Sequence, residues 1–478
     1  MKIKVIAVIL TVFAVSLSAQ LESLNDEQIT KAVEVELLVN KQIHSQLLNV
    51  DTEEGIVTLS GTTKTILQKE KAVELAETVK GVRSVIDRIE VQPEERADLA
   101  IKTDVETALL VDPVTDQYEI DVVVANGAVS LNGTVDSWAE KQLCADVAKS
   151  VRGVKDIINE IEVKPAEERP DAEIKQEVEG LLQNDVRIDE TLITVKVQDD
   201  TVTLQGTVGS ALQKRQAASK SWVPGVEAVV TDDLTVEYWA MAETRKKDPM
   251  EISDQEIKQA LKDAYLYDAR IYKFNPEITV KNGVVTLEGV VEDLRAKRAA
   301  EEDAKQTAGV WKVVNLIKVE PQLETNDMEL QERVEAAFER NPFLNDRTIK
   351  VYAFDGNVYL SGHVPYYYQK QRAEDVAAKV NGVREVTNEL TTEDAWVYKE
   401  DWELETDVKR ELLWNPMINE NDVSVRVDDG VVFLTGEVNN ITEYREAEDE
   451  AREAGALSVG NYLEIAQMPE SFSRENLR

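Results

Sequence analysis

Hydrophobic and polar residues alternate along a short segment that occurs six times in the chain. In the fourth copy, Val285 and Leu287 alternate with Thr286 and Glu288, which is typical of a half-buried β-strand. The second glycines of successive copies lie 72, 73, 83, 73 and 74 residues apart. This nearly constant period indicates tandem copies of one small domain. The copies are 55–61, 127–135, 200–208, 283–291, 356–364 and 430–438.

An amphipathic helix is predicted before each of these strands. Its apolar residues recur at i, i+4 and i+8, or at i+7 in the third copy, and the remaining positions are mostly charged or polar. The expected buried stripes are Ile29, Val33, Leu37; Ile101, Val105, Leu109; Ile174, Val178, Leu181; Ile257, Leu261, Tyr265; Leu330, Val334, Phe338; and Leu404, Val408, Leu412.

A hairpin and a second helix complete each unit. Asn-Gly or Asp-Gly pairs, such as Asn282-Gly283, predict a two-residue turn between two antiparallel strands. Repeat 3 has Asp199-Asp200 at this place, and repeat 1 is expected to have a longer turn over 51–55. The second helix ends at a glycine 19 or 20 residues after the motif glycine, and an apolar third strand follows. A right-handed strand–helix–strand crossover makes this third strand parallel to the second.

The fold class predicted is therefore α/β: a tandem array of six small two-layer sandwiches. Each is ordered helix–strand–strand–helix–strand with a three-stranded mixed sheet, and both helices are expected on one sheet face. The other face is left for solvent or a neighbouring repeat. A long linker, 238–251, is expected to divide the array into two halves of three. The predicted repeats are 26–92, 97–165, 170–237, 252–321, 327–393 and 402–468.

Residues 1–19 are predicted to be a secretory signal peptide. Lys2 and Lys4 precede an apolar run from Val5 to Val15, and small residues follow it. The alternative is an uncleaved anchor, although the run is short for a membrane span. No cysteine stands at the end of this segment to carry a lipid. We therefore expect an exported, soluble, periplasmic protein that is not lipidated.

The composition argues against several kinds of chemistry. A net charge of −38 repels nucleic acid, so no nucleic-acid partner is expected. His44 and His363 lie in different repeats, and a single cysteine, Cys144, cannot build a thiolate metal site. Cys144 is expected to be a buried, unreactive thiol. The sequence predicts no catalytic residues, no metal site, no cofactor and no small-molecule substrate, and hence not an enzyme.

Aromatic residues single out repeats 5 and 6. Counting back from the turn at 355–356 pairs Tyr352 with Tyr359 on the sheet face that the helices do not cover. Three more tyrosines, Tyr366, Tyr367 and Tyr368, follow the strand. In repeat 6 the same counting sets Arg426 opposite Phe433, a cation–π arrangement. These seven residues are the candidate binding site; the alternative is that the tyrosines pack against repeat 4 or 6.

The repeated unit resembles the BON domain of bacterial envelope proteins. The resemblance rests on the pattern Gly-x-Val-x-Leu-x-Gly-x-Val, a Gly-Val about 20 residues later, and the apolar strand that follows. Two copies depart from it, because Asp200 replaces the first glycine and Ala456 follows Gly455. The resemblance implies a small exported α/β domain that binds phospholipid surfaces or partner proteins, without catalytic residues.

Two functions remain open on this basis. The first is a non-enzymatic envelope protein whose repeats bind phospholipid surfaces or envelope partners, in osmotic or envelope stress. Several weak sites on one chain would raise its avidity. The alternative is a structural or chaperone-like periplasmic scaffold that has protein clients and binds no lipid.

Overall fold

The computed structural model describes most of the chain after the predicted signal peptide. The described residues are 24–115, 118–164, 169–241, 252–271, 274–321, 325–344, 348–392, 399–415, 417–438 and 441–465. The signal peptide and the greater part of the 238–251 linker lie outside them. Among the residues described, none of the helices is long and apolar enough to cross a membrane.

The first three repeats follow the predicted order of elements. Repeat 1 contains α1 (Asp26–Val39), β1 (Leu48–Glu53), β2 (Ile56–Thr63), α2 (Ile66–Thr78) and β3 (Ser84–Val91). Repeat 2 contains α3 (Asp98–Val111), β4 (Asp121–Ala125), β5 (Ala128–Asn132), β6 (Thr134–Val135), α4 (Trp138–Lys149), β7 (Asp156–Asn159) and β8 (Glu162–Val163). Repeat 3 contains α5 (Asp171–Gln183), β9 (Ile193–Gln198), β10 (Thr201–Val208), α6 (Ala211–Lys220), β11 (Ala228–Val230) and β12 (Leu234–Val236).

The last three repeats have the same plan. Repeat 4 contains α8 (Asp254–Tyr267), β13 (Glu277–Lys281), β14 (Val284–Glu288), β15 (Val290–Val291), α9 (Leu294–Gln306), β16 (Lys312–Asn315) and β17 (Lys318–Val319). Repeat 5 contains α10 (Asp327–Arg340), β18 (Ile349–Phe354), β19 (Asn357–Val364), α11 (Tyr367–Ala378), β20 (Glu385–Asn388) and β21 (Thr391–Thr392). Repeat 6 contains α12 (Asp401–Trp414), β22 (Val423–Asp428), β23 (Val431–Val438), α13 (Ile441–Glu453) and β24 (Ser458–Ile465).

Each sheet has the second strand in the middle, as predicted. In repeat 1, β2 pairs antiparallel with β1 and parallel with β3. The third strand is interrupted in repeat 2 without a change of register, because Leu131 pairs with Asn159 and Thr134 pairs with Glu162. The turn of repeat 1 corrects the prediction: it has two residues, Glu54 and Gly55, both with positive φ, like the turns of the other repeats.

The apolar stripes of the first helices form the cores, with one correction. Ile257, Leu261 and Tyr265 of α8 are buried against the sheet of repeat 4, as expected. In α5 the third residue of the stripe is Leu182, which is 1% exposed, and not Leu181, which is only partly buried. The i+8 position therefore faces the sheet in repeat 3 as in the other repeats.

A carboxylate ties the hairpin to the first helix in all six repeats. In repeat 4, Asp254 in the first turn of α8 accepts hydrogen bonds from the backbone N–H groups of Asn282 and Gly283, at 2.8 and 2.9 Å. Both turn residues have positive φ, so their N–H groups point away from the strands and need an acceptor. The equivalent carboxylates are Asp26, Asp98, Asp171, Asp327 and Asp401.

An asparagine makes the corresponding connection between the third strand and the second helix. In repeat 4, Asn315 donates from its side chain to the carbonyl of Lys297 at 3.0 Å, and its amide oxygen accepts from the N–H of Ile317. The same arrangement occurs at Asn159, Asn388 and Asn461. In these four repeats the sheet is therefore joined to both of its helices by a polar side chain as well as by apolar packing.

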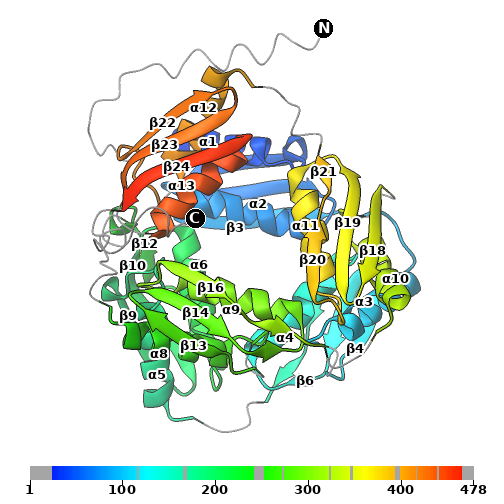
Figure 1. Cartoon of the computed structure of the whole chain (residues 1–478). Helices are drawn as coiled ribbons and strands as arrows, with labels where there is room; N and C mark the ends of the chain where they lie inside the picture. Colours follow the sequence, from blue (N-terminus) through cyan, green and yellow to red (C-terminus); the bar gives the residue numbers. More distant parts are fainter. Residues whose placement is uncertain are drawn as a thin grey trace.

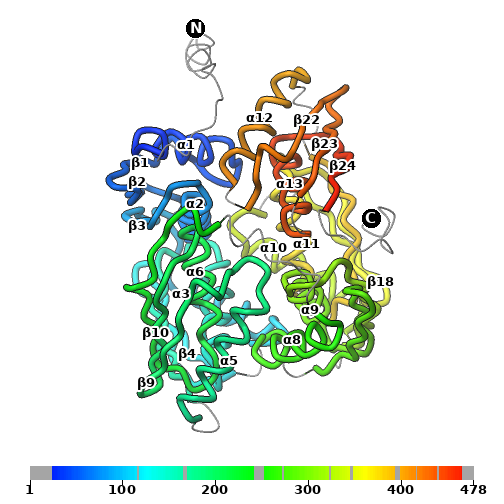
Figure 2. The backbone as a smooth tube through the Cα atoms, turned by 90° about the vertical axis from the view of Figure 1, so that its left-hand side faces the viewer, coloured from blue at the N-terminus to red at the C-terminus, as the bar shows by residue number. Residues whose placement is uncertain are grey.

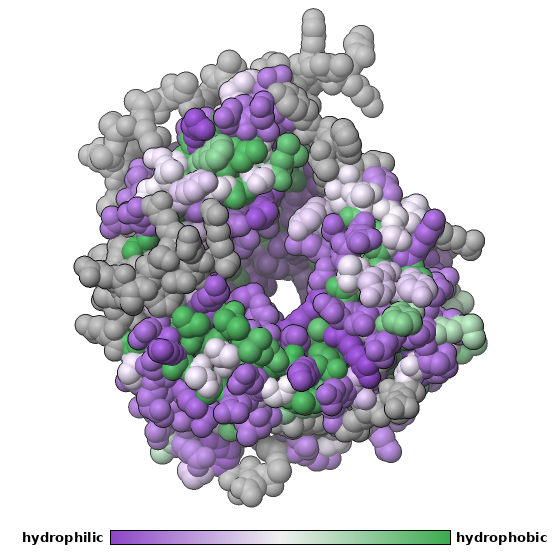
Figure 3. Space-filling view, in the orientation of Figure 1, coloured by the Kyte–Doolittle hydropathy of each residue, from purple (hydrophilic) through white to green (hydrophobic). Residues whose placement is uncertain are grey.

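The six repeats close into a ring around a central opening (Figure 1). Helices such as α2, α9, α11 and α13 surround the opening, and hydrophilic side chains border most of it in the space-filling view (Figure 3). The side view shows repeats 1–3 in one layer and repeats 4–6 in the other (Figure 2). The chain is thus divided into the two halves of three that the long linker predicts.

Neighbouring repeats share their cores. Ile66, the first residue of α2, belongs to the core of repeat 2, and Leu294, at the same place in α9, belongs to the core of repeat 5. Trp311 of repeat 4 is 4% exposed and packs in the core of repeat 6. Polar contacts cross between the layers as well, as where Ala308 donates its N–H to the carbonyl of Asn184 at 2.8 Å.

Repeats 1 and 6 meet where the ring closes. The Lys80 ammonium lies 2.8 Å from the carboxylate of Glu420. Close by, burial together with the neighbouring carboxylate of Glu411 raises the pKa of Glu36 to about 9. One carboxylate oxygen of Glu36 is buried without a hydrogen-bond partner in the described part of the chain. The closing interface therefore holds carboxyl groups that are more stable there when protonated.

We expect the Asp254→Ala variant to lose the connection between α8 and its hairpin. Removing a charged acceptor of two hydrogen bonds should lower the free energy of unfolding of repeat 4 by about 1–3 kcal/mol. Hydrogen exchange should show faster exchange of the Asn282 and Gly283 amides. Gln255→Ala, an exposed neighbour on the same helix, is the control and should leave both amides unchanged. Equal protection of the two amides in both variants would contradict the role assigned to Asp254.

A second expectation concerns the pH dependence of the closing interface. Between about pH 4.5 and about pH 9 the folded chain keeps a proton on Glu36 that the unfolded chain releases, so stability falls as pH rises. Glu36→Gln should raise the melting temperature at about pH 8 and flatten its decline between about pH 6 and about pH 9. Glu34→Gln, exposed on the same helix, should retain the wild-type slope. Parallel pH profiles for Glu36→Gln and the wild type would disprove the assignment.

Candidate functional site

The sheet of repeat 5 presents an aromatic outer face. Tyr352 of β18 and Tyr359 of β19 pair in register, as predicted, and their ring centroids lie 6.2 Å apart. Their sequence neighbours Ala353 and Val358 point inward and are buried. Strand pleating thus separates an apolar inner face from an aromatic outer one. Tyr352 and Tyr359 are 59% and 39% exposed.

Phe354 also belongs to this face, although the sequence analysis did not include it. It is 58% exposed and lies at the end of β18, two residues after Tyr352 on the same side of the strand. The period-2 spacing of Tyr352 and Phe354 was the signal that could have identified it. We call Tyr352, Phe354 and Tyr359 the aromatic face.

Tyr352 and Tyr359 are not buried against repeat 4 or 6. Neighbouring repeats contact one another largely through helices and helix ends, as Ile66, Leu294 and the α2–α6 contact illustrate. The outer side of the sheet of repeat 5 takes no part in these shared cores, so its aromatic residues stay exposed. A closed ring therefore does not require the aromatic face to be buried.

The three consecutive tyrosines after β19 have different surroundings. Tyr366 precedes α11 and stacks on Tyr368, with centroids 5.7 Å apart and planes 13° apart. Tyr368 is half-buried and meets Phe343 of the repeat 5 core edge to face at 5.8 Å. Tyr367 is exposed. Tyr366 and Tyr367 are thus surface residues, whereas Tyr368 mainly anchors the start of α11.

Repeat 6 carries a smaller aromatic group on the equivalent face. The guanidinium of Arg426 lies 5.0 Å from the centroid of the Phe433 ring, as the register predicts. Phe433 in turn stacks on Tyr462 of β24 at 6.3 Å, a residue that the sequence analysis missed because only the hairpin pairing was counted. Asp428, 3.6 Å from Arg426, partly neutralises the cation at this exposed place.

The residues examined for chemistry are not brought together. His363 lies at the end of β19, where its Nδ1 is 3.2 Å from the Thr391 hydroxyl, and His44 precedes a short 3-10 helix in repeat 1. Cys144 is fully buried, and burial raises the pKa of its thiol to about 12, so the reactive thiolate is disfavoured. Among the described residues, no group of His, Cys, Asp and Glu could hold a metal ion.

Comparison with known proteins agrees with this architecture. The chain is 33% identical over 148 residues to Osmotically-inducible protein Y of Escherichia coli, covering 30% of this chain and 74% of that protein. It is 31% identical over 139 residues to the outer membrane lipoprotein DolP of Haemophilus influenzae, covering 28% and 72%. A solved structure, the C-terminal domain of CdsD of Chlamydia trachomatis, matches with 18% identity and a TM-score of 0.13 over 40% of this chain and 90% of that one. A TM-score this low does not support a conclusion about the fold of this chain.

The family model of the BON domain matches the chain six times, in step with the six repeats described above. The matched residues are 25–93, 97–165, 170–238, 253–321, 326–394 and 400–467. Together these matches cover nearly the whole of the described chain, and the chain therefore belongs to the BON domain family, with six tandem copies of the domain.

Proposed function

We propose that this chain is a non-enzymatic protein of the bacterial envelope that binds phospholipid surfaces through the aromatic face of repeat 5. Its relatives include an osmotically inducible protein and an outer membrane lipoprotein, which supports a role in the envelope under osmotic or envelope stress. The observation that carries the proposal is the exposure of Tyr352, Phe354 and Tyr359 on one uncovered sheet face.

These side chains suit the boundary between lipid and water. Tyrosine and phenylalanine have large apolar rings, and tyrosine keeps a hydroxyl that remains hydrated, so such residues gather at membrane interfaces. A β-sheet holds the three rings in fixed positions, so little side-chain freedom is lost on binding. The exposed Lys350 stands on the same side of β18 and supplies a cation beside the rings.

Electrostatics sets the conditions for binding. The chain carries a net charge of −38, so an anionic membrane repels it at long range. Salt shortens the range of this repulsion, and the screening length is about 8 Å at physiological ionic strength. We therefore expect binding to zwitterionic vesicles at low salt, and to anionic vesicles only when salt or calcium is added.

A scaffold for protein clients is the second candidate. The observation in its favour is the closed ring, in which the repeats bury much of their surface against one another. Exposed tyrosines are also common where proteins bind each other. In that case the aromatic face would bind protein and the chain would not bind vesicles.

Flotation with vesicles tests the first candidate, using the double variant Tyr352→Ser, Tyr359→Ser. Losing two rings removes roughly 1–2 kcal/mol each of apolar contact, so vesicle binding should weaken at least about tenfold. The control is Thr279→Ser, Thr286→Ser, which changes the equivalent outward pair of repeat 4 and should bind like the wild type.

Circular dichroism of both double variants should show the wild-type fold, because the changed side chains are outside the core. If the wild-type protein fails to float with any vesicle, at any salt or calcium concentration, the lipid proposal is wrong and the scaffold is favoured. Equal flotation of the tyrosine variant and the wild type would instead remove the aromatic face from the proposal.

A further inference from the structure

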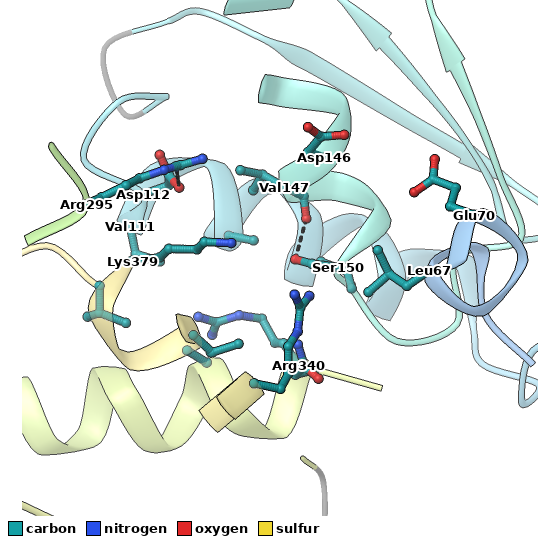
Figure 4. Close-up of a pocket in the computed structure, with 17 residues that line it drawn as sticks. Leu67, Glu70, Val111, Asp112, Asp146, Val147, Ser150, Arg295, Arg340 and Lys379 are labelled. Carbon is teal, nitrogen blue, oxygen red and sulfur yellow. Dashed lines mark hydrogen bonds and ion pairs between the residues drawn. The ribbon is translucent and has the colours of Figure 1, made fainter. Parts of the chain in front are cut away.

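A cavity of about 310 Å³ lies inside the ring where repeats 1, 2, 4 and 5 meet (Figure 4). Its walls come mainly from α2, α4, α10 and α11, with Arg295 of α9 at one edge. Arg340 and Lys379 reach into this space in Figure 4, whereas Glu70 and Asp146 lie away from them. The cavity is at the lower end of the range of about 300–1,000 Å³ that is usual for ligand pockets.

The carboxylates of the cavity wall already have cationic partners. Asp112 is paired with Arg295 across the boundary between repeats 2 and 4. Glu70 and Asp146 both contact Lys149, at 2.7 and 3.2 Å. Arg295 and Lys149 therefore largely neutralise these three carboxylates, and the other cations of the wall form no ion pair with them.

Three cations of the wall remain, and we call Arg340, Arg372 and Lys379 the cation cluster. Within the part of the chain that the structure describes, their side chains have neither a hydrogen bond nor an ion pair, and the Nε of Arg372 is buried without a partner. Burial lowers the pKa of Arg340 and of Arg372. Burial, with the positive charges of Arg295 and Arg372, lowers the pKa of Lys379 to about 8.

Such a cluster is unexpected in this chain. There are 92 acidic and 54 basic side chains, so carboxylates are in large excess. Elsewhere in the ring, half-buried arginines do have close carboxylates, as Arg187 has Asp185 at 2.7 Å and Arg270 has Asp268 at 2.6 Å. Asp375 acts on Arg372 and Lys379 only through space. Partly burying cations that have no directly bonded carboxylate costs free energy, which an anion in the cavity would offset.

We propose that this cavity binds a small phosphate-bearing anion. Guanidinium groups hold phosphate oxygens through two parallel hydrogen bonds, and a lysine ammonium adds a point charge. The neighbouring cavity of about 650 Å³ shares Asp146, Arg295 and Lys379 with this one, so the two cavities adjoin. The bound anion would join repeat 5 to repeats 2 and 4 and would stabilise the ring.

This proposal is independent of vesicle binding by the aromatic face. The cation cluster lies on α10 and α11 and just after them, in the helix layer, whereas the aromatic face is on the outer side of β18 and β19. Failure of one proposal therefore leaves the other untouched.

Calorimetric titration and thermal unfolding with inorganic phosphate test the cavity, with sodium chloride at equal ionic strength as the reference. The reference is needed because salt alone screens the repulsion of a strongly acidic chain. Phosphate should raise the melting temperature of the full chain above the chloride value, since a ligand of the folded state stabilises it. Arg372→Gln and Lys379→Gln should each weaken phosphate binding at least about tenfold.

The matched control is Arg384→Gln, which removes a cation of repeat 5 that is paired with Asp355 at the outer hairpin. It should bind phosphate like the wild type. Without phosphate, Arg372→Gln should melt higher than the wild type, because it removes a half-buried guanidinium that has no ion pair among the described residues; a purely structural arginine would give the opposite shift. Lys379→Gln, at an exposed side chain, keeps the test valid if Arg372→Gln does not fold.

Two further ligands identify the source of the phosphate group. Glycerol 3-phosphate should compete with inorganic phosphate if the site takes phosphomonoesters. Vesicles of phosphatidylglycerol that compete with phosphate would identify a lipid headgroup, and vesicles that do not compete would identify a free anion. Equal stabilisation of the wild type by phosphate and chloride, or equal phosphate affinity of the wild type and both cavity variants, would overturn the proposal.

Discussion

One carboxylate per repeat, in the first turn of the first helix, connects the two layers of each BON domain. It accepts the N–H groups of a hairpin turn whose residues have positive φ, at distances of 2.8 to 3.3 Å in the six repeats. The turn fixes the register of the two antiparallel strands, and the carboxylate fixes the turn against the helix. The positions of the outward side chains, including the aromatic face, depend on that register.

The arrangement of the repeats determines which surfaces are free. Each domain covers one sheet face with its own helices and uses the helices again for contact with its neighbours. The outer sheet faces are consequently available for binding, and the helix layer encloses the cavity with the cation cluster. Two different chemistries are thus kept apart, aromatic rings on the outside and unpaired cations within (Figures 1 and 4).

Much of the single domain could be predicted from the sequence, because its determinants are local. The pairing of Tyr352 with Tyr359 follows from the turn three residues away, and the buried stripe of α8 follows from helical spacing. Leu182 could have been chosen over Leu181, because the other five helices all place the third core residue at i+8. The role of Asp254 was hidden among many other carboxylates, and a spacing of 28 residues carries no local signal.

The ring and its cavity could not be predicted from the sequence, because they depend on contacts between distant repeats. Lys80 and Glu420, for example, are 340 residues apart and belong to repeats whose contact no periodicity predicts. The cation cluster likewise depends on which helices meet. Arg340 and Lys379 look like ordinary solvated side chains in sequence, and only the packing of α10 and α11 against repeats 1, 2 and 4 places them on the wall of one cavity.

The shared cores have a consequence for how the chain assembles. Trp311 of repeat 4 fills part of the core of repeat 6, and Ala211 of repeat 3 does the same for repeat 1. Trp414 of repeat 6 also packs against the core of repeat 1, so a chain that emerges from its N-terminus cannot complete that core until the last repeat has appeared. Until then the first half exposes apolar side chains that are buried in the complete protein. The folding of repeat 6 against repeat 1 is the step that completes the ring.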